Sequence, residues 1–246
     1  MEQEKILQLQ QGLTTAFMNQ AISSNLAYRP QFISNNYREG RKVFSSIENE
    51  LLSCEEFSIS VAFITMGGIT PLLQTLRELE CRGIPGRILT TDYLAFSDPK
   101  ALRILANFKN IELKMFVTEN AKEGFHTKGY IFKKKEIYRM IVGSSNMTLS
   151  ALTKNREWNT KIVSTDQGEY AQNLVSEFEQ LWNAEESLSF EQFIESYTKL
   201  YTKNKLIKKQ RETARQEEIP SLEMYRLQPN SMQIGFINNL RTMYEA

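Results

Sequence analysis

Two kinds of hydrophobic pattern alternate along most of this chain. Short, nearly continuous apolar runs such as Phe57–Ile64 are typical of buried strands, whereas apolar residues three or four positions apart, as in 43–52, are typical of amphipathic helices. Over residues 41–185 the two patterns follow each other with short connections. This order predicts an α/β fold in which helices flank a mixed sheet.

The remaining elements of this segment are expected in chain order. Helices are predicted over 65–83, over 98–108 with Asp98 as N-cap, and over 168–183. A charged turn joins two of the expected strands into a hairpin. The strands are expected over 86–93, 111–118, 125–135, 137–145 and 157–165.

The composition changes on both sides of the α/β segment. Residues 1–40 are mixed and partly irregular, so we expect a separate N-terminal segment before a domain over 41–185. A charge-dense stretch over 186–219 predicts a helical extension that serves as a linker. After Pro220 a new helical pattern begins, which indicates the start of a further domain over 220–246.

Charge and cysteine usage narrow the setting in which the protein works. The formal net charge is +1, so a polyanionic partner has to be bound by local patches. Cys54 and Cys81 stand in no metal-ligand or redox spacing and are expected to be buried small residues. The N-terminus lacks a signal-peptide pattern, and no stretch is apolar enough to span a bilayer. We therefore expect a cytoplasmic protein with no membrane partner.

The only histidine, His126, is the centre of a group of polar residues. It stands two positions before Lys128, so both side chains are expected on the same face of a strand. The predicted hairpin returns the chain through Gly143, where the missing side chain allows close backbone approach. This return places Asn146 near the pair, and Glu157 opens the next expected strand.

These residue types suit phosphodiester cleavage without a metal ion. His126 is the candidate nucleophile, which attacks phosphorus to give a phosphohistidine. Lys128 and Asn146 are candidate donors to the phosphate oxygens as negative charge develops. Glu157 is the candidate carboxylate that holds the imidazole in the correct tautomer.

The two serines before Asn146 have a different expected role. Once His126 is committed as nucleophile, no base remains to activate Ser144 or Ser145, so both are expected to donate hydrogen bonds to phosphate instead. No metal site and no cofactor are expected.

At these residues the chain resembles the phospholipase D superfamily, whose signature is H-x-K followed by a small-residue turn that ends in Asn. The signature stands here as residues 126–128 and 143–146. Lys133 occupies the position at which lipid-hydrolysing members carry Asp, whereas the spacing from Asn146 to Glu157 is similar to that of nuclease and phosphodiesterase members without this Asp. The resemblance covers roughly residues 41–184 and implies a phospholipase D-like sandwich.

The runs GFHTKGYIF, IVGSSNMT and NREWN are similar to the nuclease-like domain that precedes bacterial DEAD/DEAH-box helicases. The terminal LQPNSMQIGFINNL resembles the segment that opens such a helicase core. The resemblance therefore implies a DNA-cleaving domain linked to a helicase. Members of the superfamily use one histidine as nucleophile and a second as acid, so a chain with His126 alone implies a homodimer that shares one site.

Two other classes of function stay open at this point. The domain is either a catalytically weak or inactive module that binds DNA and positions the helicase, or a scaffold that only dimerises it. Individual residues also have two interpretations. Trp158 either packs or stacks on a base, and the lysines over 133–135 either are solvated or contact a phosphate backbone. The segment 90–92 either caps the core or forms a ligand loop at a strand end.

Overall fold

A computed structural model describes residues 2–36, 38–119 and 121–217 of the chain. Contacts divide the chain into two compact units, Met1–Tyr201 and Thr202–Ala246. The first unit contains the whole α/β fold and all of the residues singled out around His126. The predicted start of a helicase domain over 220–246 lies outside the described residues.

One mixed sheet of eight strands forms the centre of the first unit, as the hydrophobic pattern predicts. The strand order is β1-β7-β6-β5-β2-β3-β4-β8. β2, β3 and β4 run parallel to one another, and every other neighbouring pair is antiparallel. The strands are β1 (Gln31–Ile33), β2 (Glu56–Val61), β3 (Gly86–Thr91), β4 (Ile111–Phe116), β5 (Lys128–Lys134), β6 (Ile137–Gly143), β7 (Asn159–Thr165) and β8 (Ser187–Ser189).

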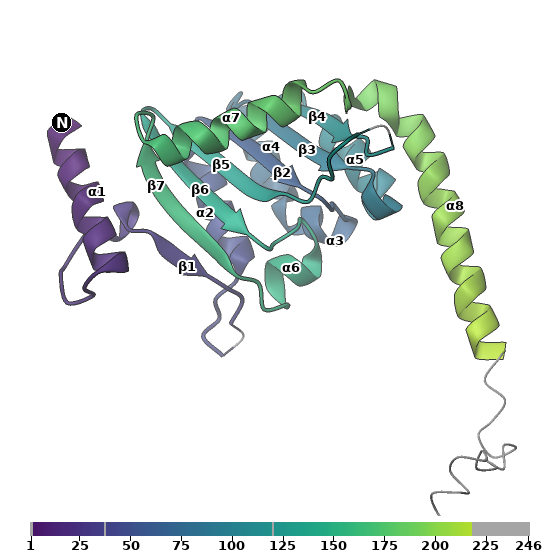
Figure 1. The fold of residues 1–246 in the computed structure, drawn as a ribbon, viewed down its shortest axis with the longest axis horizontal. Coiled ribbons are helices and arrows are strands. Elements are labelled where there is room, and N and C mark those ends of the chain that lie inside the picture. The colour runs from purple at the N-terminus through teal and green to yellow at the C-terminus, as the bar shows by residue number, and fades with distance from the viewer. Residues whose placement is uncertain (1, 37, 120, 218–246) are drawn as a thin grey trace, which may run out of the picture. The chain divides into compact units, whose positions relative to one another are not determined.

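Helices cover both faces of this sheet (Figure 1). α7 (Glu169–Asn183) crosses one face, where Phe178 and Trp182 pack against strand residues such as Met140. The other face carries the larger core. Its helices are α2 (Val43–Ser53), α3 (Met66–Ile69), α4 (Leu73–Cys81), α5 (Pro99–Ala106), α6 (Leu149–Thr153) and the first turns of α8 (Phe190–Glu217).

The helix predicted over 65–83 is divided into α3, a 3-10 turn η2 (Thr70–Leu72) and α4. Pro71 lies in the middle of this segment and has no N–H to donate to the preceding turn, which explains the interruption. The predicted Asp98 cap is confirmed, since its side chain accepts a hydrogen bond from the Lys100 amide.

The compact unit extends beyond both boundaries that the sequence predicts at residues 40 and 185. On the N-terminal side, β1 pairs with β7, and Leu9 of α1 packs against Ile137 and Val163. On the C-terminal side, β8 pairs with β4, and Phe193 of α8 is buried in the larger core. Charge density therefore does not mark the end of the unit, because apolar residues of the first turns of α8 still face the sheet. The N-terminal helices are α1 (Glu2–Phe17) and the 3-10 turn η1 (Leu26–Tyr28).

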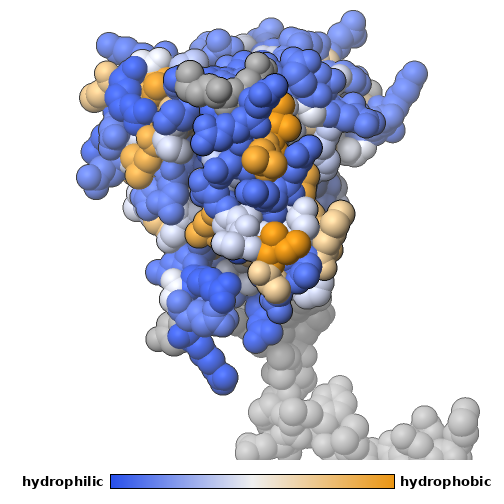
Figure 2. Space-filling view, turned by 90° about the vertical axis from the view of Figure 1, so that its left-hand side faces the viewer, coloured by the Kyte–Doolittle hydropathy of each residue, from blue (hydrophilic) through white to orange (hydrophobic). Residues whose placement is uncertain are grey.

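Figure 2 shows the side of the molecule that lies on the left of Figure 1. Hydrophilic side chains dominate this surface, and hydrophobic ones form small separate patches. Within the described ranges, no helix is both long and apolar enough to cross a membrane.

The two cysteines differ in environment. Cys54 is buried, and desolvation raises the pKa of its thiol to about 11. Cys81 is exposed at the end of α4, so the expectation that both cysteines are buried is wrong for this residue. Helical periodicity explains the difference, because Leu76 and Leu79 take the core-facing positions of α4.

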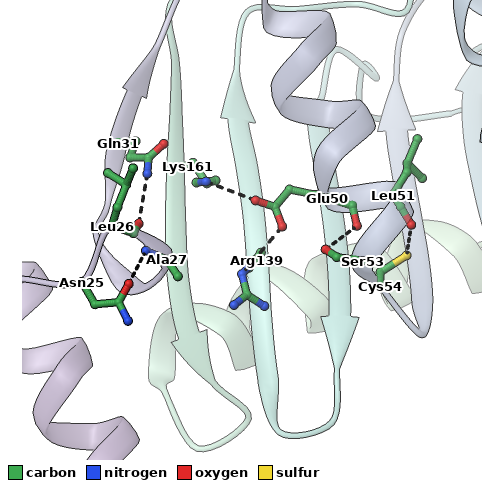
Figure 3. A network of polar contacts seen from close by, with 10 residues as sticks. All are labelled: Asn25, Leu26, Ala27, Gln31, Glu50, Leu51, Ser53, Cys54, Arg139 and Lys161. Carbon is green, nitrogen blue, oxygen red and sulfur yellow. Dashed lines mark hydrogen bonds and ion pairs between the residues drawn. The ribbon is translucent and has the colours of Figure 1, made fainter.

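A buried carboxylate ties α2 to two neighbouring strands (Figure 3). The carboxylate of Glu50 is 3.1 Å from Nζ of Lys161 on β7 and 3.7 Å from Nε of Arg139 on β6. The Glu50 side chain is only 10% exposed, and those of Lys161 and Arg139 are 13% and 20% exposed. This ion-paired cluster fixes the helix over the antiparallel part of the sheet that carries the candidate site.

Candidate active site

His126 and Lys128 lie side by side at the start of β5. Lys128 is the first residue of this strand, and His126 precedes it in an irregular segment rather than within a strand as predicted. The Lys128 ammonium is 2.8 Å from Nδ1 of His126 and also donates to the His126 carbonyl oxygen at 2.8 Å. The His126 side chain is exposed, so a ligand in solution can reach it.

Asn146 follows β6 and is fixed to the segment after β2. Its side-chain oxygen accepts a hydrogen bond from the Phe63 amide at 3.1 Å, and the Met147 amide donates to the Phe63 carbonyl at 3.0 Å. Gly68 permits this arrangement, because a Cβ there would lie 1.9 Å from the Met147 carbonyl oxygen. The hydrogen bond to the side-chain oxygen fixes the orientation of the Asn146 amide group. The N–H groups of this amide have no acceptor among the described residues.

Ser144 and Glu157 form a second pair on the same side of the site. The Ser144 hydroxyl donates to the Glu157 carboxylate and accepts from the Trp158 amide at 3.1 Å. The Ser144 amide donates to the Trp158 carbonyl at 3.1 Å. The predicted close approach at Gly143 is observed, since a Cβ there would lie 2.2 Å from the Trp158 carbonyl oxygen.

Ser145 points in the opposite direction to Ser144. It is fully buried, and its hydroxyl accepts a hydrogen bond from the Asn159 side chain at 2.9 Å. Its carbonyl oxygen accepts from the hydroxyl of the buried Tyr130 at 3.0 Å. The structure therefore does not support the predicted contact of the Ser145 side chain with phosphate and gives this residue the role of anchoring the turn before Asn146.

The electrostatic partner of Glu157 differs from the predicted one. Its carboxylate is hydrogen-bonded to Ser144 and not to the imidazole of His126, whose Nδ1 faces Lys128 instead. Partial burial lowers the pKa of the Lys128 ammonium below its usual value, and the negative charge of Glu157 opposes this effect. Within one copy of the chain, Glu157 thus acts on Lys128 rather than on His126.

Aromatic residues that the sequence analysis did not single out surround the imidazole. The rings of Phe63 and Tyr93 each lie 6.4 Å from the His126 ring in edge-to-face geometry, and Phe96 packs on Phe63 at 4.9 Å. These residues follow β2 and β3, whose carboxyl ends meet at one edge of the sheet. The sequence feature that could have identified these residues is their position after two strands that end at this shared edge, where α/β folds place their ligand loops.

The loop that carries Tyr93 is held in a strained conformation. Leu94 and Ala95 have φ angles of +57° and +45°, which L-residues rarely adopt. The Asp92 carboxylate fixes the loop by accepting from the amide and the hydroxyl of Thr118 at 2.8 and 2.9 Å. The preceding Thr90 and Thr91 are fully buried, which agrees with the core-capping interpretation of this strand end.

A hollow of about 430 Å³ opens beside these groups. Asn146, Glu157, Phe63, Phe96 and Lys154 are among the residues that line it. It thus joins hydrogen-bond donors, a carboxylate and aromatic surface next to the histidine. Among the described residues, those of this site included, no group of three His, Cys, Asp or Glu side chains is arranged to hold a metal ion.

Comparison with known families agrees with this geometry. The family model described as "Cardiolipin synthase, PLD-like domain" matches residues 48–182, which is more than half of the chain. The chain therefore belongs to the phospholipase D-like family, whose members act on phosphodiester linkages. A comparison with curated protein sequences finds no match.

Solved structures show the same fold. The chain is similar to NucT from Helicobacter pylori, with a TM-score of 0.51, 19% identity, and coverage of 66% of this chain and 99% of that one. It is also similar to Nuc, a phospholipase D family member from Salmonella typhimurium, with a TM-score of 0.51, 18% identity and the same two coverages. Phosphatidylserine synthase from Haemophilus influenzae gives a TM-score of 0.50 at 14% identity, over 75% of this chain and 46% of that one. These similarities confirm the predicted phospholipase D-like sandwich.

Proposed function

We propose that this chain is a nuclease that cleaves DNA without a metal ion, through a covalent phosphohistidine formed on His126. The observation that carries the proposal is the exposed imidazole with the Lys128 ammonium 2.8 Å from its Nδ1. A cation this close disfavours a metal ion at the same nitrogen and favours a phosphate next to it. Asn146 adds oriented amide N–H groups from the neighbouring strand end.

The contact between Lys128 and His126 has a consequence for the ring proton. An ammonium that donates to Nδ1 places the imidazole proton on Nε2, where it blocks attack on phosphorus. A bound phosphate draws the ammonium away, which frees Nδ1 to carry the proton and Nε2 to attack. Substrate binding and activation of the nucleophile are coupled in this way through Lys128.

The proposed reaction has two steps. In the first, Nε2 of His126 forms a bond to phosphorus while the bond from phosphorus to the leaving oxygen breaks, and a second histidine protonates that oxygen. In the second, water attacks phosphorus, gives a proton to the second histidine, and the N–P bond breaks to restore His126. Because each chain has one histidine, the second one comes from another copy of the chain in a homodimer.

The choice of DNA as substrate rests on the similarity of the motifs around His126, Asn146 and Glu157 to helicase-associated nuclease-like domains. The solved structures named Nuc and NucT are consistent with it. Linkage to a helicase and a cytoplasmic location belong to the same proposal.

A DNA-binding and dimerisation module is the second candidate. It is favoured by one observation, namely that the His126 imidazole faces Lys128 and has no carboxylate partner in the part of the chain that the structure describes. A site with this arrangement holds a DNA phosphate even if it cleaves the phosphodiester bond slowly.

Cleavage of end-labelled single- and double-stranded DNA by the wild type in excess EDTA separates the two candidates. The nuclease proposal predicts shortened products with EDTA present. DNA that is bound but remains intact would favour the binding module, and cleavage that needs an added divalent ion would contradict the mechanism.

The pH profile of cleavage is expected to report the lowered pKa of Lys128. Because the reaction needs the ammonium form, activity should fall on the alkaline side at a pH below 10.5, the ordinary pKa of lysine. Glu157→Gln removes the charge that raises this pKa, so the alkaline limb should move to lower pH. Lys128→Arg keeps a permanent cation, and whatever activity it retains should show no such limb.

Lys135→Arg is the matched control for these profiles, because Lys135 is exposed at the hairpin tip. The assignment of the alkaline limb to Lys128 is wrong if this limb has the same position in the wild type and in Glu157→Gln.

A further inference from the structure

A second hollow, of about 720 Å³, lies next to the site where the N-terminal segment meets the chain between α6 and β7. Its lining includes Phe32, Arg38, Lys154, Arg156 and Trp158. Phe32 and Arg38 lie before the region that the family model matches. This hollow is therefore a feature that the N-terminal segment adds to the family fold.

The charge of this hollow is positive. Arg38, Lys154 and Arg156 are exposed, and no carboxylate among the described residues lies within ion-pair distance of any of them. Glu39 also lines the hollow, but its carboxylate is paired with Arg41. Three cations that form no ion pair with the described residues, placed around one concave surface, favour a ligand with several negative charges.

Two aromatic rings stand out from the same surface. Trp158 is 73% exposed and Phe32 is 62% exposed, and their rings contact edge to face with centroids 6.0 Å apart. Both are held by backbone structure, since Phe32 pairs with Thr160 across β1 and β7 and the Trp158 amide donates to Ser144. A fixed and solvent-facing indole is a platform on which a nucleobase stacks.

The hollow adjoins the one beside the candidate active site, with which it shares the lining residue Lys154. Trp158 follows directly after Glu157, which lines the hollow that contains Asn146. A ligand that extends through both hollows therefore passes Lys154 on its way to the site.

We propose that this hollow is a flanking subsite for single-stranded nucleic acid. One base stacks on Trp158, the backbone phosphates contact Arg38, Lys154 and Arg156, and the strand continues toward His126. The inference rests on the proposed function, because it extends the same site along its substrate. The combination of aromatic platforms with a basic groove is characteristic of surfaces that bind single strands with little sequence preference.

Intrinsic fluorescence provides a direct test, because the chain has two tryptophans and Trp182 is buried. A short oligothymidylate added to the full chain, in a His126→Gln background that prevents cleavage, should quench the emission in a saturable way. Trp158→Phe should abolish the response. Trp158→Ala should weaken binding about tenfold or more, and Lys154→Ala with Arg156→Ala should weaken it and make it less sensitive to salt.

Lys134→Ala with Lys135→Ala is the matched control and should leave binding unchanged, since these lysines are exposed at the hairpin tip, at the end of β5 that lies away from His126. The subsite would be overturned if the oligothymidylate quenched the fluorescence equally with Trp158 present and with Trp158→Phe. It would also be overturned if the protein bound a duplex of the same length as tightly as the single strand. A Trp158→Ala protein that becomes monomeric with its DNA affinity intact would overturn it as well, because the surface would then be an interface between copies.

Turnover of bis(p-nitrophenyl) phosphate separates this proposal from the proposed function. With a wild-type His126, Trp158→Ala should cleave this small diester at the normal rate and DNA more slowly. If the wild type cleaves neither substrate but quenching depends on Trp158, the nuclease proposal fails and the subsite stands. If Trp158→Ala cleaves both substrates normally, the subsite fails and the nuclease stands.

Discussion

His126→Gln is expected to lower DNA cleavage in excess EDTA by about 10⁴-fold or more, since losing a catalytic nucleophile removes the covalent route altogether. Glutamine keeps a polar side chain of similar reach, and the position is exposed, so the variant should fold normally. The measurement is initial rates on end-labelled DNA, with thermal unfolding as the check on folding.

Lys122→Gln is the matched control for His126→Gln, because it is a nearby exposed residue outside the site. It should cleave at the wild-type rate. Activity in His126→Gln within about tenfold of wild type would contradict a covalent role for the histidine.

The same variant tests whether two copies share a site. When equal amounts of wild type and His126→Gln exchange subunits, only dimers with two histidines should be active, so activity per wild-type chain should fall to about half. Unchanged activity would mean that each chain works alone.

Glu50→Ala is expected to destabilise the α/β unit by about 3 kcal/mol, which corresponds to a drop in Tm of roughly 10 °C. The carboxylate pairs with both Lys161 and Arg139 in a largely buried position, and its removal leaves two poorly solvated cations without this partner. Urea unfolding monitored by circular dichroism measures the change.

The exposed Glu112 on β4 supplies the control for this effect, since Glu112→Ala removes the same charge without a buried partner. Its stability should stay within about 0.5 kcal/mol of wild type. Equal stability of the two variants would show that the ion-paired cluster contributes little.

The sequence predicts the parts of the site that depend on local spacing. Side chains two residues apart along an extended chain point to the same side. His126 and Lys128 are close together for this reason, although β5 begins only at Lys128. Gly143 was expected to allow close backbone contact, and it does so against Trp158. The same alternation explains the error at Ser145, because adjacent residues point to opposite sides and one of the two serines had to face the interior.

Other features depend on which distant segments become neighbours. The aromatic group around His126 comes from two different strand ends, and one sequence does not specify how those strands align. β1 and β8 have only three residues each and form because an edge of the sheet is available to pair with them. The orientation of Glu157 toward Ser144 follows from the same long-range packing.

The most direct test of the central claim is detection of a covalent phosphohistidine on His126. Wild-type protein is incubated with internally phosphorus-labelled DNA in excess EDTA, quenched in alkali and separated on a denaturing gel. We predict label on the polypeptide that is stable in alkali, is released by mild acid because an N–P bond is acid-labile, and is absent from His126→Gln. Cleavage without any labelled polypeptide, or a label that survives acid treatment, would contradict the mechanism.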